Sequence, residues 1–225
     1  MTKKADITNC DVVFCDYSEV DANGNVLVQN RTKYLSDFIT GRDAALKQLS
    51  DDITIGMRSG IYKTSVIKNN NIFFDTNRKY GEDMIFIVKT LLEANKVISV
   101  NKVLAFYVIW SNSVTQNVSL KHLDCYYSYV DLLQYIRKKG GLKEIEKFLL
   151  EYKIPYSISH VFSILSKDPK FYDDLFQFLN KEQVSESLKQ YKIQKIDKSN
   201  IRYFIQCSCM RRCPKLLIKV LNKIR

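Results

Sequence analysis

A chain of 225 residues, 46% of them hydrophobic, is long enough to bury one sizeable core, so we expect a folded protein and exclude a disordered one. No stretch of 18 uncharged apolar residues occurs, and no signal-peptide core follows Met1, which excludes a transmembrane helix and predicts a soluble, cytoplasmic protein. The six cysteines are scattered along the chain, so we interpret them as reduced thiols.

The net charge of +11 is concentrated in the second half of the chain. Residues 1–120 hold 14 Lys and Arg against 13 Asp and Glu, whereas residues 121–225 hold 21 against 11. From Ser199 to the last residue there are seven basic residues and no acidic one. Such a segment favours an anionic partner.

The first half of the chain mixes strands and helices. Two apolar runs, Cys10 to Tyr17 and Val26 to Val28, flank the turn residues Asp21-Ala22-Asn23-Gly24 and predict a strand, a turn and a second strand. Apolar spacing then predicts a helix over 42–49, a strand and a short helix within 53–74, a helix opened by Tyr80-Gly81-Glu82-Asp83, and strands at 97–100 and 103–109.

From Ser119 onward the apolar spacing is helical throughout. We expect helices over 123–139, 142–152, 155–166, 171–180, 182–191 and 202–224, with breaks at Asp168-Pro169 and Gly140-Gly141 and an interruption at Pro214. The predicted fold class is therefore α/β, with a partial sheet in residues 1–118 and an all-helical region in residues 119–225.

Three cysteines lie close together near the end of the chain, at Cys207, Cys209 and Cys213. A structural zinc site needs four ligands, and both histidines, His122 and His160, lie far away in sequence. We interpret these cysteines as small apolar residues of a helix and predict no metal site in the chain.

The adjacent carboxylates Glu82 and Asp83 are the leading candidates for chemistry. They follow a glycine and a polar loop and precede an amphipathic helix, so at least one of them can face a cleft. Acids in the first turn also stabilise a helix through its dipole, and taken alone this pair favours that capping role.

The wider sequence changes that interpretation. The segments and their order resemble family 2 glycosyltransferases of the bacterial polysaccharide type, which have a GT-A fold. The similar segments are Asp11 to Tyr17, Asp21 to Asn25, Ile61 to Ile67, Asn70 to Phe74, Tyr80 to Asp83 and Asn101 to Tyr107. The likeness spans residues 5 to about 118, and the Glu-Asp pair is its most specific element.

The resemblance implies an inverting transfer of a sugar from a nucleotide-sugar donor to a cell-surface polysaccharide, such as a capsule or lipopolysaccharide, or to a lipid-linked glycan. Asp83 would be the general base that deprotonates the acceptor hydroxyl, because an inverting attack on the anomeric carbon needs a carboxylate on that side. Glu82 would position the acceptor or support Asp83. Tyr80 and Trp110 would contact the acceptor.

The chain differs from the family pattern in two places, and both differences concern the site for the nucleotide-sugar donor. Where many relatives have a basic or imidazole side chain that reaches the diphosphate or its metal, this chain has Trp110, followed by Ser111-Asn112-Ser113. Trp110 can stack on a sugar or pack in a core, and the core role is the more common one.

The second departure is the absence of the nucleotide-binding half and of the Asp-x-Asp-type motif that holds Mg²⁺ or Mn²⁺ in relatives. Asp51-Asp52 follows a predicted helix and is interpreted as a surface turn, and Asp173-Asp174 is no better placed. We therefore expect a truncated protein that is inactive alone, or one completed by another polypeptide or by oligomerisation.

The basic C-terminal segment, Arg202 to Arg225, has three readings. Its mixture of cations and aliphatic residues fits peripheral attachment to an anionic membrane surface, and it fits equally a helix packed on the chain's own core. Nucleic-acid binding comes third, because no binding motif accompanies the charge. The alternative to an enzyme is a non-catalytic membrane-surface or partner-binding module derived from one.

Overall fold

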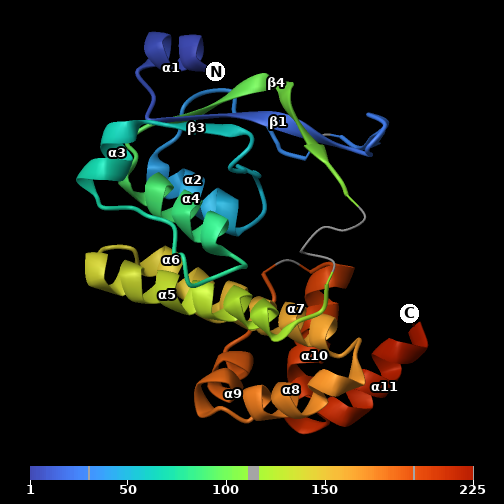
Figure 1. Cartoon of the computed structure of the whole chain (residues 1–225). Coiled ribbons are helices and arrows are strands. Elements are labelled where there is room, and N and C mark those ends of the chain that lie inside the picture. The colour runs from blue at the N-terminus through green and yellow to red at the C-terminus, as the bar shows by residue number, and fades with distance from the viewer. Residues whose placement is uncertain (30, 111–116, 195, 225) are drawn as a thin grey trace. The chain divides into compact units, whose positions relative to one another are not determined.

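The computed structural model describes residues 1–29, 31–110, 117–194 and 196–224, and the chain divides into two compact units (Figure 1). The sheet unit comprises Met1–Thr76 and Glu82–Gln116, and the helical unit comprises Asn77–Gly81 and Asn117–Arg225. The expected α/β class, with a small sheet region followed by a helical region, is confirmed.

A four-stranded sheet forms the centre of the sheet unit. Its middle strand, β1 (Val12–Val20), is buried along almost its whole length. This strand pairs antiparallel with β2 (Val26–Val28) and β3 (Gly60–Tyr62), and parallel with β4 (Val97–Val108). The sheet is therefore mixed, and β1 organises it because every other strand pairs with β1.

The predicted hairpin is present, and its turn is stabilised locally. The Asp21 carboxylate accepts hydrogen bonds from the backbone N–H groups of Asn23 and Asn25, both at 2.8 Å. Gly24 has a positive φ of 85°, a conformation that glycine adopts without strain. These short-range contacts explain why four turn residues were enough to predict the hairpin.

The two strands predicted at 97–100 and 103–109 are one continuous strand, β4. The prediction was wrong at the junction because the pairing with β1 shifts there: Cys15 is opposite Val100, but Asp16 is opposite Val103. A bulge of this kind interrupts the regular alternation of side chains without ending the strand.

Helices α2 (Gly41–Leu49) and α4 (Glu82–Glu93) lie side by side along one face of the sheet (Figure 1). The two helices approach very closely at Gly41, where an added Cβ would lie 2.0 Å from the Leu91 carbonyl oxygen. Thr40 caps α2 by accepting a hydrogen bond from the Asp43 N–H at 3.1 Å. The short helix α3 (Thr64–Asn69) follows β3.

Two features of the sheet unit were not predicted from the sequence. Residues Thr2–Thr8 form a helix, α1, and Ala5 of this helix and the preceding Met1 pack against Cys10, Val13 and Ile98. At the start of β1, the buried carboxylate of Asp11 accepts hydrogen bonds from the Asn95 N–H at 2.8 Å and the Lys63 ammonium at 3.1 Å. Burial alone would raise the pKa of Asp11, but these hydrogen bonds outweigh it and lower the pKa.

The helical unit consists of short helices around one apolar core. In chain order they are η2 (Leu120–Leu123), α5 (Asp124–Lys139), α6 (Lys143–Phe148), η3 (Leu149–Lys153), α7 (Ile154–Leu165), η4 (Pro169–Phe171), α8 (Tyr172–Leu179), α9 (Glu182–Lys189), α10 (Lys198–Arg212) and α11 (Pro214–Ile224). The largest fully buried side chains of the core are Tyr126, Leu132, Ile136, Ile145, Leu149, Ile158, Phe162 and Leu165.

The predicted breaks at Gly140, Asp168 and Pro214 are confirmed, but the gap expected between residues 152 and 155 is absent. There α6, η3 and α7 follow one another without interruption, and η3 is a π-helical turn. Proline lacks the N–H that an α-helical hydrogen bond needs, and the π-helical turn directly before α7 accommodates Pro155.

All six cysteines are free thiols, and Cys10, Cys15 and Cys207 are buried. Burial raises the pKa of the Cys207 thiol to about 12, which is the behaviour of a small apolar core residue. Across the described residues, every helix is too short or too polar to span a bilayer.

Candidate active site

The acidic pair forms the first turn of α4, as the sequence predicted. Glu82 is half-buried and Asp83 is exposed, and Asp83 accepts a hydrogen bond from the Met84 N–H at 2.7 Å. The opposite face of the helix is buried in the sheet unit through Ile85, Phe86, Ile87, Val88, Leu91 and Leu92. This packing fixes the backbone that presents the two carboxylates.

An aromatic cluster surrounds the first two turns of α4. Phe86 stacks on Phe74 with ring centres 4.3 Å apart, and it meets the edge of Tyr62 at 6.0 Å. Burial raises the pKa of Tyr62, and the negative charge of Asp83 raises it further. The Tyr62 hydroxyl therefore lies within electrostatic reach of Asp83. The neighbouring Phe73 is 72% exposed, an apolar surface of the kind on which sugar rings stack.

The loop that precedes the acidic pair, Asn77–Gly81, belongs to the helical unit and is held on α5. Arg78 pairs with Asp131, and the Lys79 N–H donates to the Asp124 carboxylate at 2.9 Å. These contacts join residues 45 and 53 positions apart in the chain, so local sequence patterns could not predict them.

Tyr80, predicted to contact the acceptor, stacks on the buried His122 with ring centres 4.3 Å apart. Its backbone carbonyl accepts a hydrogen bond from the Ser128 hydroxyl at 3.2 Å. One face of the Tyr80 ring is thus already occupied. The sequence suggested no role for His122 or Ser128, and the structure identifies both as residues that position this loop.

Gly81 is required by the backbone at this point. Its φ is 84°, and an added Cβ would lie 3.0 Å from the Ser128 hydroxyl oxygen and 3.1 Å from the Ser128 Cβ. Gly140 offers a matched comparison, because its φ is 73° but nothing lies within 4 Å of an added Cβ. Substitution of Gly140 therefore tests the cost of a positive φ alone, whereas substitution of Gly81 adds the steric contact with Ser128.

We expect Gly81→Ala to lower the free energy of unfolding by about 2–3 kcal/mol, and Gly140→Ala by about 1 kcal/mol. Both substitutions force a non-glycine residue to a positive φ, and only the first also displaces Ser128. Urea unfolding followed by circular dichroism would measure both. Equal losses for the two variants would show that the contact with Ser128 contributes nothing.

Trp110 lies just beyond β4, where the Ile109 N–H donates to the Val20 carbonyl at 2.8 Å. Its side chain is 62% exposed, so the expectation that a core tryptophan is the more common case is wrong for this residue. The exposed ring is accessible to a sugar. Stacking of a sugar on Trp110 stays a prediction. The neighbouring Ser111-Asn112-Ser113 lies outside the described residues.

A cation held between aromatic rings was missed by the sequence analysis. The Arg58 guanidinium lies 4.6 Å from the centre of the Tyr17 ring and 3.9 Å from that of Tyr107. Tyr17 belongs to β1 and Tyr107 to β4, and Arg58 itself is exposed. The two rings orient a positive charge at the surface of the sheet unit, where it can attract an anion.

A divalent cation does not fit the described residues. No group of three or more His, Cys, Asp or Glu side chains in this part of the chain is arranged to hold a metal ion. Asp51 and Asp52 lie in the turn after α2, where Asp51 has a φ of 60° and Asp52 accepts a hydrogen bond from Ser50 at 2.9 Å. The interpretation of these acids as a surface turn is confirmed, and Asp173 and Asp174 lie in the first turn of α8.

Neither Glu82 nor Asp83 is among the residues that line the following four cavities of the described part of the chain. In the sheet unit, a cavity of about 360 Å³ is lined by Asp11, Tyr62 and Lys63 together with residues of α1 and β1. In the helical unit, cavities of about 620, 630 and 420 Å³ are lined by helical residues. Tyr62, which borders the first of these cavities, also feels the negative charge of Asp83.

Comparison with solved structures identifies the fold. The crystal structure of S. aureus TarS 1–349 in complex with UDP-GlcNAc matches with a TM-score of 0.53 and 15% identity, over 95% of this chain and 60% of that chain. The structure of S. aureus TarS 1–349 matches with a TM-score of 0.50 and 15% identity, over 95% and 59%. No protein-family model and no curated protein sequence matches the chain.

TarS is a glycosyltransferase, so this chain has a glycosyltransferase-like fold. At 15% identity the likeness concerns the fold alone. The chain spans about 60% of the length of the TarS 1–349 structures that it matches.

Proposed function

We propose that this chain is the acceptor-side part of an inverting family 2 glycosyltransferase with a GT-A-type fold, acting in the synthesis of a cell-surface polysaccharide or lipid-linked glycan. The observation that supports it most is the fold shared with TarS 1–349, a protein bound to UDP-GlcNAc, over 95% of this chain. The acidic pair at the start of α4 provides the carboxylates that such a transfer needs.

In the proposed reaction, the Asp83 carboxylate takes the proton of an acceptor hydroxyl. The acceptor oxygen then forms a bond to the anomeric carbon, the bond from that carbon to the nucleotide diphosphate breaks, and the electron pair leaves with the diphosphate. Attack from the face opposite the leaving group inverts the anomeric configuration. Glu82, half-buried beside Asp83, orients the acceptor, and the exposed ring of Trp110 stacks on it.

The proposal assigns the donor site to residues outside these 225, as the family resemblance implies. The family uses Mg²⁺ or Mn²⁺ at its donor site, and the described residues of this chain form no group of three or more His, Cys, Asp or Glu side chains that could hold it. The proposed location is the cytoplasm, where nucleotide sugars are made.

A chimera tests the proposal. In it, the part of TarS 1–349 that the match leaves uncovered is joined to this chain, and release of UDP from UDP-GlcNAc is followed with a glycan acceptor present. We expect turnover by the chimera and none by this chain alone. Binding of UDP to the chimera is measured in parallel, so that a chimera that binds UDP but releases none contradicts the proposal.

A further inference from the structure

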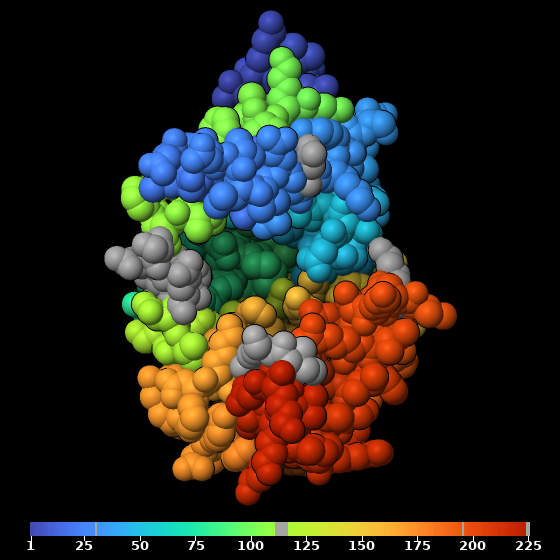
Figure 2. All heavy atoms as spheres, turned by 90° about the vertical axis from the view of Figure 1, so that its right-hand side faces the viewer, coloured from blue at the N-terminus to red at the C-terminus, as the bar shows by residue number. Residues whose placement is uncertain are grey.

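The two C-terminal helices, α10 and α11, form a strongly basic surface. Residues 198–225 contain no Asp or Glu and eight Lys or Arg residues: Lys198, Arg202, Arg211, Arg212, Lys215, Lys219, Lys223 and Arg225, the last of which lies outside the described residues. Figure 2 shows α11, in red, at the surface of the helical unit. Its charge is therefore available to an anion in solution or on a surface.

Helix α11 has one buried face and one exposed apolar edge. Leu217, Ile218 and Leu221 are buried and attach the helix to the core of the helical unit. Leu216 and Val220, one helical turn apart, are 58% and 43% exposed. One side of α11 is therefore buried by packing within the helical unit, and aliphatic side chains on its other side are exposed to solvent.

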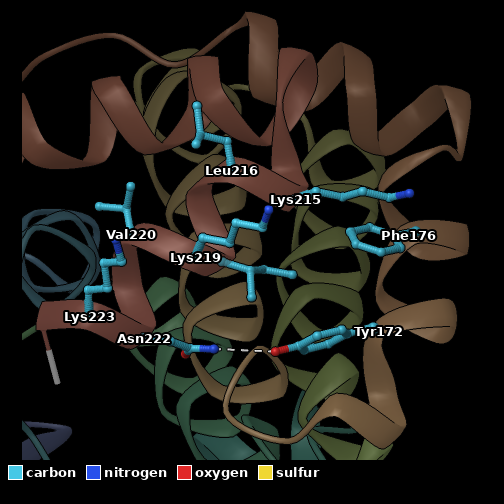
Figure 3. Close-up of a pocket in the computed structure, with 9 residues that line it drawn as sticks. Tyr172, Phe176, Lys215, Leu216, Lys219, Val220, Asn222 and Lys223 are labelled. Carbon is cyan, nitrogen blue, oxygen red and sulfur yellow. Dashed lines mark hydrogen bonds between the residues drawn. The ribbon is translucent and has the colours of Figure 1, made fainter.

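A groove of about 620 Å³ runs along α11 on the side of α8 (Figure 3). Its lining is apolar and aromatic, with the three ammonium groups of Lys215, Lys219 and Lys223 along it. Lys215 lies 5.8 Å from the ring centre of Phe176. The Asn222 amide donates to the Tyr172 hydroxyl at 3.3 Å, which links α11 to α8 across the groove.

A second groove of about 630 Å³ lies between α10 and α11. Ile201 and Ile205, which are 42% and 54% exposed, line it together with the cations Lys198 and Arg202. Val220 borders both grooves, so they adjoin along α11. No carboxylate is among the residues that line either groove.

We propose that the face formed by α10 and α11 docks on an anionic lipid bilayer, with lipid phosphates on Lys215, Lys219 and Lys223 and the exposed aliphatic residues inserted between headgroups. The charge of the face complements anionic headgroups, and its apolar grooves accept acyl chains. This inference is independent of the proposed transferase activity.

The aliphatic residues distinguish a bilayer from a nucleic acid. A phosphate backbone attracts lysines but offers nothing apolar in which Leu216 and Val220 could be buried. A bilayer offers both an anionic surface and a hydrocarbon interior. Docking on a bilayer therefore uses the cations and the aliphatic residues together, and removal of either set weakens it.

Sedimentation of the full chain with vesicles tests the proposal. The vesicles are phosphatidylcholine, with or without phosphatidylglycerol, and the variants are Lys215→Gln/Lys219→Gln/Lys223→Gln and Leu216→Gln/Val220→Gln. The control, Lys138→Gln/Lys143→Gln/Lys147→Gln, removes the same charge from exposed lysines elsewhere in the helical unit. Circular dichroism checks that each variant is folded.

We expect the wild-type chain to bind only the anionic vesicles, and the first triple variant to bind them roughly 100-fold more weakly, at roughly fivefold per cation. The aliphatic variant also binds more weakly, whereas the control binds like the wild type. An equal loss in the control would reduce the effect to net charge and overturn the proposal. Binding to a nucleic-acid duplex but not to vesicles would overturn it as well.

Discussion

Asp83→Asn is expected to lower the turnover of the chimera by about 10²–10⁴-fold, the range typical for the loss of a general base. An amide cannot take the proton of the acceptor hydroxyl at neutral pH. The amide oxygen can still accept the hydrogen bond from the Met84 N–H, so the first turn of α4 stays formed. The measurement is UDP release under saturating donor and acceptor.

Two variants serve as controls for Asp83. Asp37→Asn makes the same chemical change at an exposed residue of the sheet unit that also accepts a hydrogen bond from the next N–H, at 2.7 Å, and it is expected to leave turnover unchanged. Glu82→Gln is expected to raise the KM for acceptor more than it lowers kcat, because Glu82 is assigned a positioning role. Unchanged turnover in Asp83→Asn would remove Asp83 from the mechanism and favour a non-catalytic module.

Local signals in the sequence were sufficient for several elements. The hairpin turn depends on hydrogen bonds between Asp21 and residues two and four positions away, and α4 follows from the spacing of its apolar residues. The division between α10 and α11 follows from Pro214, which begins α11. Each of these elements is determined by residues that lie close together in the sequence.

Features that depend on distant contacts could not be predicted. The loop Asn77–Gly81 is held by residues of α5, and Arg58 lies between rings on two different strands. The exposure of Trp110 depends on how the chain leaves β4. For the candidate site, the sequence therefore predicted the acidic pair and its helix, but not the residues that hold the preceding loop on α5.

Asp16 is the strongest example of a residue whose role appears only in the structure. Its side chain is fully buried in β1 beside the shift in pairing with β4. One carboxylate oxygen accepts hydrogen bonds from the backbone N–H groups of Tyr17, Arg31 and Thr32, at 2.8, 3.0 and 3.2 Å. Thr32 in turn accepts one from the Thr54 N–H at 2.8 Å, so the network joins the central strand to two loops.

Asp16→Ala is therefore expected to lower the free energy of unfolding by about 3 kcal/mol, because it leaves buried N–H groups without an acceptor and creates a cavity. Asp16→Asn keeps an oxygen in the same place and is expected to cost about 1 kcal/mol. Urea unfolding of both variants, followed by circular dichroism, measures the difference. If the two variants lose the same stability, an accepting oxygen alone is not what stabilises the loops, and the negative charge that both substitutions remove must be the dominant contribution.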